Sequence, residues 1–385
     1  MDLKPPDLPD IARRIADIRE VIIANIVLLG QVPAPTFHES RKAAAFCERL
    51  NESQIDECTT DGYNNPIGII RGSAPSKPPI FLVAHLDTFF DKEIIYNFTV
   101  GKTYIEGPGL LDNSVGVGVL ASMPQILRFL DLRFESDIVL AGVIQSLGHG
   151  NLRGIRHLLK TWVTPIRGAI SIEGVELGRL NYFSDGMIRC EIQCSVNPAT
   201  GFTEKHQPNA ILVLNEMINQ IMELGVPQRP RSQIIIGKIS GGITHGRMAH
   251  HASLGMEIHS DAMRVVKSLY QKIKDIVDGF NQEYDVNLKL KIISNLHAAR
   301  LKFNHPLVKS AVEVMQQLKL KPVSEASESE LSILLARGIP SVTLGITHGE
   351  NKYEENARVK IQPMFKGIAQ ILGVMAAIDR GVCDG

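Results

Sequence analysis

Short apolar runs that alternate with helix-period segments are the feature that most constrains the fold. Continuous apolar runs typical of buried strands lie at 78–84, 137–143, 169–172 and 338–345. Apolar residues recur at helical spacing at 9–30, 39–50, 115–130, 152–162, 305–319 and 363–378. Strands and helices that alternate in this way form an α/β sheet with helices on both faces. The sequence therefore predicts an α/β fold.

A different pattern occupies residues 187–296. Segments that alternate in and out, typical of half-exposed antiparallel strands, lie at 187–196 and 286–293. Further strands are expected at 233–239 and 253–258, and helices at 209–221 and 261–280. This order of strand, helix, strand, strand, helix and strand is typical of a split βαβ, ferredoxin-like α+β domain. We therefore expect an inserted domain at 187–296 and a main domain made of 1–186 and 297–385.

Composition excludes several classes of function. Lys and Arg total 41, as do Asp and Glu, and no basic block is present, so neither nucleic acid nor an anionic membrane surface is an expected partner. The acidic, proline-rich N-terminus does not resemble a signal peptide, and the apolar runs are too short to span a bilayer. Five cysteines without a CxxC indicate neither a disulfide framework nor a cysteine zinc site. The expected location is the cytoplasm.

A polar motif, His85-x-Asp87, ends the apolar run at 78–84. Residues two apart on a strand project to the same face, which at the carboxyl end of a sheet opens onto the usual ligand crevice. A histidine with a carboxylate beside it suits a metal ligand whose second ring nitrogen is held. The alternative is an ordinary polar strand end.

Two further acids follow the same logic. Asp112 lies in the glycine-rich segment 107–118 before a helix, and Glu173 ends the run at 169–172. Together with His85 they would supply three N/O ligands, as in a catalytic zinc site. The alternatives are a helix N-cap for Asp112 and a capped strand end for Glu173. A phosphate-binding loop is disfavoured because the segment lacks the GKS/T of a P-loop.

These motifs, in this order, resemble the zinc-dependent exopeptidases of the M20 group and its M28 and M42 relatives. The resemblance covers nearly the whole chain. It rests on PAPTFHES at 33–40, Asn64 and Asn65, AHLDT at 84–88, GPGLLDN at 107–113, His206 with NAI at 209–211, SGG at 240–242, SEASESEL at 324–331 and GIPSVTLG at 338–345. The family comprises peptidases and deacylases such as glutamate carboxypeptidase, peptidase T and succinyl-diaminopimelate desuccinylase.

The resemblance implies a mixed sheet flanked by helices, and a lid or dimerisation domain through which many members form homodimers. It implies a first metal held by His85, Asp112 and Glu173, with Asp87 behind His85. It also implies a cis peptide bond after Asp112. The family binds a second metal through the same Asp, the second Glu of a Glu-Glu pair and a C-terminal His. The first Glu of that pair is the general base.

The chain departs from the family at the second metal. Gln145 stands at the base position, and a Gln amide cannot take a proton from water at neutral pH. Ser146 and Tyr353 stand at the two private ligand positions, so we expect at most one zinc ion per chain. His149 and His348 are candidate substitutes. In the lid domain, His206, His245 and Arg247 are the candidate substrate residues.

Two functions remain open from the sequence. The first is a metal-dependent hydrolase of exopeptidase or N-acyl amino acid deacylase type, impaired by the loss of the base and acting on a peptide or an N-acyl amino acid. The alternative is a non-catalytic descendant that keeps the fold as a ligand-binding or interaction protein.

Overall fold

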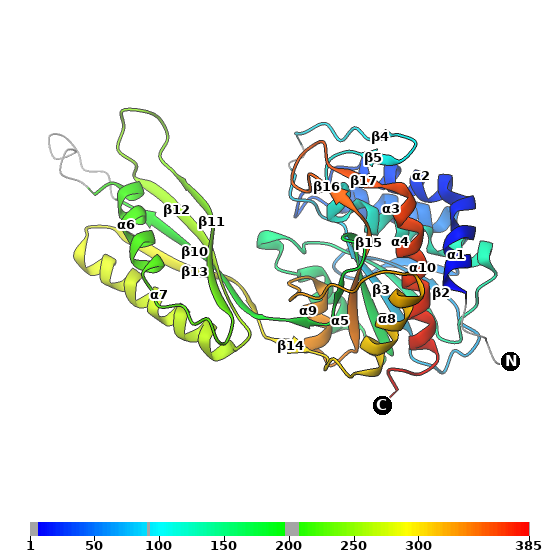
Figure 1. The fold of residues 1–385 in the computed structure, drawn as a ribbon. Helices are drawn as coiled ribbons and strands as arrows, with labels where there is room; N and C mark the ends of the chain where they lie inside the picture. The colour runs from blue at the N-terminus through cyan, green and yellow to red at the C-terminus, as the bar shows by residue number, and fades with distance from the viewer. Residues whose placement is uncertain (1–6, 91–92, 197–207, 385) are drawn as a thin grey trace. The chain divides into compact units, whose positions relative to one another are not determined.

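The computed structural model describes residues 7–90, 93–196 and 208–384 (Figure 1). The chain divides into two compact units. The first consists of Met1–Phe183 with Arg300–Gly385, and the second is Ser184–Ala299. Each unit has its own hydrophobic core.

A seven-stranded mixed sheet forms the centre of the first unit. Its order is β1-β2-β6-β3-β7-β15-β8. β6, β3, β7 and β15 run parallel to one another, whereas β1 pairs antiparallel with β2, β2 with β6, and β8 with β15. The strands are β1 (Glu57–Thr60), β2 (Pro66–Ile70), β3 (Ile80–His85), β6 (Ile138–Val143), β7 (Gly168–Val175), β8 (Leu180–Asn181) and β15 (Ser341–Thr347). The parallel strands are fully buried, as the continuous apolar runs predict.

Helices cover this sheet on both sides (Figure 1). α4 (Val115–Leu130) and α10 (Ile361–Asp379) pack on the central strands, and α1 (Leu8–Ile15), α2 (Arg19–Gly30) and α8 (Pro306–Gln317) pack against those two helices. α3 (Ser40–Glu52) packs on β2, while α9 (Glu330–Ala336) packs on β7 and β15 and α5 (Arg153–Thr161) packs against α9. Among the described residues, α10 has the length and hydropathy of a membrane span, and 78% of that apolar stretch is buried.

A small antiparallel sheet of order β16-β17-β5-β4 also belongs to the first unit. Its strands are β4 (Thr99–Val100), β5 (Tyr104–Glu106), β16 (Gly349–Glu350) and β17 (Arg358–Lys360). The turn between β16 and β17 consists of residues 351–357.

The second unit is a four-stranded antiparallel sheet with two helices. Its order is β11-β12-β10-β13, and α6 and α7 pack on it. The elements are β10 (Gly186–Ser195), α6 (Ala210–Met222), β11 (Ser232–Gly241), β12 (His251–Ser260), α7 (Met263–Glu283) and β13 (Asn287–Leu296). Short strands β9 (Phe183–Ser184) and β14 (Ala299–Arg300) pair where the chain passes between the units.

The predicted α/β class with a mixed sheet flanked by helices is confirmed. The helix expected at 9–30 is broken by a 3-10 turn, Ala16–Ile18, into α1 and α2. α9 and the small sheet are absent from the prediction because their segments are too short to show a period.

Candidate metal centre

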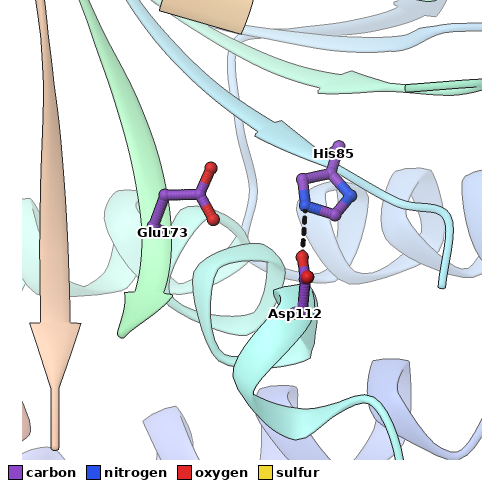
Figure 2. Close-up of side chains that lie close together, drawn as sticks. All are labelled: His85, Asp112 and Glu173. Atoms are coloured by element: carbon purple, nitrogen blue, oxygen red, sulfur yellow. Dashed lines mark ion pairs between the residues drawn. The ribbon is translucent and has the colours of Figure 1, made fainter. Parts of the chain in front are cut away.

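Three polar side chains converge at the carboxyl edge of the central sheet (Figure 2). His85 is the last residue of β3, and Glu173 lies near the end of β7, the parallel neighbour of β3. Asp112 comes from the turn Leu110–Ser114 that precedes α4. One ligand atom of each residue lies within 4.8 Å of the other two, and His85 Nε2 is 2.9 Å from Asp112 Oδ1. The structure thus brings together the three predicted ligands of the first metal.

Asn113 fixes the turn that carries Asp112. Its amide donates to the Ile172 carbonyl at 2.8 Å and accepts from the Gly174 N–H at 2.9 Å. These two bonds clamp the turn onto β7 on both sides of Glu173. The Asp112–Asn113 peptide bond is cis, as the resemblance implied.

Asp87 lies behind His85. The Nδ1 atom of His85 is 3.1 Å from the Asp87 carbonyl oxygen and 3.4 Å from its carboxylate Oδ1. The other oxygen, Oδ2, accepts from the Thr36 hydroxyl and from the backbone N–H groups of Ser146 and Leu147, at 2.8–3.0 Å. Asp87 therefore orients the imidazole and also anchors the turn after β6.

That turn keeps a fixed backbone around Gln145. Gln145 has a φ of 52°, in the left-handed region, and its N–H donates to the buried Glu39 carboxylate at 3.0 Å. The side-chain Oε1 of Gln145 accepts from the Tyr63 hydroxyl at 2.8 Å. An amide held in this way offers no lone pair basic enough to remove a proton from water.

The side chain of Ser146, which stands where the family has a glutamate ligand, is hydrogen-bonded to a carboxylate from another part of the chain. Its hydroxyl donates to Glu330 Oε1 at 2.5 Å, and both side chains are buried. Glu330 begins α9, within the segment 324–331 whose sequence resembles a family motif. The motif was visible in the sequence, but nothing in it indicated that this carboxylate would reach residue 146.

At the C-terminal ligand position, which the sequence assigned to Tyr353, the neighbouring residue is the one that lies beside Asp112. Tyr353 is 69% exposed and packs edge-on against Phe89, so its ring lies on the surface. The preceding residue, Lys352, reaches the site, where its Nζ lies 3.1 Å from Asp112 Oδ2. Sequence reasoning missed Lys352 because counting back from strand 359–361 placed the site at the next residue.

The remaining predicted residues lie elsewhere. His348 forms an ion pair with Glu176 and lines a cavity with Tyr104, Arg358 and Lys360. Within the described part of the chain, neither His348 nor the exposed His149 belongs to the His85 cluster. His245 and Arg247 are exposed in the second unit, and His206 lies outside the described residues.

Burial and charge together set the protonation of the cluster. Burial lowers the pKa of His85, but hydrogen bonds to Asp112 and Asp87 outweigh it and hold the pKa well above its usual value. Burial raises the pKa of Glu173 to about 7, with Asp112 and Glu330 adding to the rise and His85 and Arg179 opposing it. For Asp112, burial is outweighed by His85 and Lys352, so its pKa lies well below the ordinary value.

The donor set fits a divalent metal ion. One imidazole nitrogen and two carboxylates, buried and within 4.8 Å of one another, match the three protein ligands of a catalytic zinc site. Beside Asp112 Oδ2 lies the ammonium of Lys352, and the Ser146 hydroxyl is bonded to Glu330; an ammonium and a neutral hydroxyl are not the ligands that zinc prefers.

No family model and no curated protein matches this sequence. Solved structures do match. The dipeptidase Dug1p from Saccharomyces cerevisiae aligns with a TM-score of 0.79 at 12% identity over 97% of this chain and 98% of that one. A tripeptidase from Staphylococcus aureus aligns with a TM-score of 0.73 at 18% identity over 94% and 99%. YxeP from Bacillus subtilis, a dinuclear metal-binding peptidase of the M20 family, aligns with a TM-score of 0.63 at 13% identity over 94% and 98%.

The chain therefore has the fold of metal-dependent exopeptidases. More specifically, it is similar in structure to M20-family peptidases over nearly its whole length, and His85, Asp112 and Glu173 form a candidate metal site at the carboxyl ends of its strands.

Proposed function

We propose that this protein is a metal-dependent hydrolase of exopeptidase or N-acyl amino acid deacylase type that works slowly with one zinc ion. The observation that supports it is the buried convergence of His85, Asp112 and Glu173. The substrate class follows from the neighbours in structure, which include a dipeptidase and a tripeptidase.

Each residue has a role in this proposal. His85, Asp112 and Glu173 hold the ion, and Asp87 fixes the ring of His85 through Nδ1. When bound, the ion supplies Lewis-acid polarisation of the scissile carbonyl. Gln145 fills the place of the base without accepting a proton, which removes the ~10²–10⁴-fold that general-base catalysis contributes.

Metal content and turnover test this function together. After loading with Zn²⁺ and removal of free ion, we expect one zinc per chain, placed by anomalous scattering between the three ligands. Turnover of dipeptides and N-acyl amino acids should be weak and should vanish in His85→Ala. Two ions per chain with rapid turnover would contradict the proposal.

The alternative is a non-catalytic protein that retains the fold as a ligand-binding or interaction module. The hydrogen bonds that fix Gln145 to Tyr63 and Ser146 to Glu330 favour it, because both side chains are engaged within the protein. Binding of a dipeptide that raises the melting temperature, with no hydrolysis in wild type and His85→Ala alike, would support this alternative.

The second unit is the proposed lid and dimerisation domain. Its edge strand β11 exposes Ile235 and Ile239, and Ile243 follows shortly after, which suits pairing with a second copy. His206, His245 and Arg247 remain the proposed substrate residues of this unit, and cytoplasm the proposed location. Light scattering that gives the 42.4 kDa monomer mass at micromolar concentration would contradict a homodimer.

A further inference from the structure

The carboxylate of Asp112 faces two different partners. Its Oδ1 lies 2.9 Å from His85 Nε2, and its Oδ2 lies 3.1 Å from the Nζ of Lys352. A carboxylate that bridges two cations presents one oxygen to each of them. Here one oxygen faces the proposed metal ligand and the other faces an ammonium.

Lys352 is held in this position by its surroundings. It lies in the turn between β16 and β17, and because its side chain is 32% exposed and that of Asp112 is 12% exposed, the contact between them is partly shielded from water. Because solvent screens a partly buried ion pair less, this contact is stronger than one on an open surface. Nearby, the bond between Ser146 and Glu330 occupies the hydroxyl at the neighbouring ligand position.

We propose that the Lys352 ammonium takes the place of a second metal ion and limits the site to one divalent cation per chain. The inference rests on the proposed function in that His85, Asp112 and Glu173 hold the first ion. Lys352 acts as a positioning residue, because it neutralises Asp112 and keeps its second oxygen from another cation.

Charge balance supports this assignment. Asp87, Asp112, Glu173 and Glu330 place four carboxylates around the site, and one divalent ion with one ammonium already offsets three of their four charges. A second divalent ion beside Lys352 would leave excess positive charge in a buried place, which is costly.

Zinc affinity provides the main test. We would measure Zn²⁺ binding by chelator competition, and confirm stoichiometry by elemental analysis, for wild type, Lys352→Met, Lys352→Arg and Lys366→Met. Lys366 is an exposed lysine on α10 and serves as the matched control. Lys352→Met removes the charge that repels the ion, so its dissociation constant should fall about tenfold, within the usual range for coupling between two bound ligands. Lys352→Arg and Lys366→Met should remain near wild type.

The outcomes separate this inference from the proposed function. One zinc per wild-type chain with unchanged affinity in Lys352→Met would overturn the role of Lys352 alone. Absence of zinc from wild type would overturn the single-metal function, and a gain of zinc in Lys352→Met would then still support an excluding ammonium. If the Met variant does not fold, Lys352→Gln carries the same expectation.

A gain of ligands provides an independent test. Ser146→Glu restores a carboxylate but leaves Lys352 in place, so it should still bind one Co²⁺ ion per chain. Ser146→Glu with Lys352→His should bind two, with the altered magnetic spectrum of a coupled pair. Two Co²⁺ ions in Ser146→Glu alone would contradict the proposal.

Discussion

The two sides of the candidate metal centre differ in what they have kept. Around His85 and Glu173, side chains and scaffold both match the metal-binding pattern. Around Gln145 and Ser146, Glu39 and Asp87 hold the backbone, while the two side chains bond to Tyr63 and Glu330 within the protein. The difference teaches that the hydrogen bonds that hold the backbone of such a site do not depend on which functional side chains the backbone carries.

The largest expected effect comes from removing the residue that both sides share. Asp112→Ala deletes a proposed ligand and the partner of Lys352. Zinc affinity should therefore weaken by more than ~100-fold, which exceeds the loss usual when a residue that only hydrogen-bonds to a metal ligand is changed. Chelator competition measures this. A loss of zinc affinity below tenfold would contradict the comparison, because zinc binding at His85 and Glu173 would then not depend on Asp112.

A smaller loss is expected from Asp87→Asn. The amide keeps the size of the side chain but weakens the hold on His85 Nδ1 and on the turn at Ser146, so zinc affinity should drop by ~10–100-fold. The matched control is Asp56→Asn, an exposed aspartate of the first unit that accepts from the Arg71 N–H. Equal affinities for the two variants would show that Asp87 does not support the ligand.

A buried lysine near the scaffold allows a pH test. Burial lowers the pKa of Lys42 to about 8, with Asp87 and Glu39 opposing the shift. Because the unfolded chain holds that proton up to about pH 10.5, it binds more protons than the folded chain between about pH 8 and 10.5, and stability from this group rises with pH there. Relative to Lys42→Met, the wild-type free energy of unfolding should increase by about 2 kcal/mol from pH 8 to 10. If chemical denaturation gives wild type and Lys42→Met the same change in the free energy of unfolding between pH 8 and 10, the prediction is wrong.

The smallest effect is expected from restoring the base alone. Gln145→Glu should change peptidase turnover by less than about tenfold, because the second ion still lacks its ligands. The fuller rescue combines Gln145→Glu and Ser146→Glu with Lys352→His. Since Tyr353 is exposed, Tyr353→His in place of Lys352→His is the control that should fail.

The candidate ligands were predictable from the sequence because a local pattern at each one was joined by a resemblance that covers nearly the whole chain. His85 ends β3 and Glu173 lies two residues before the end of β7, and parallel strands place their carboxyl ends at one edge of a sheet. Lys352 was not predictable in this way, since a turn without periodicity does not show how far its side chain reaches. Glu330 lay in a recognised motif, yet its contact with Ser146 depends on the packing of α9 against the sheet.

The Asp87 carboxylate has a consequence for how this protein tolerates substitution. Its Oδ2 binds the backbone, not the side chains, of Ser146 and Leu147, and Glu39 binds the backbone of Gln145 in the same manner. A mutation at these positions therefore exchanges a functional group without breaking the bonds that shape the turn. Side chains at the turn can therefore change while its backbone keeps its shape, and the cost of a substitution at Ser146 is set by the buried bond between its hydroxyl and Glu330.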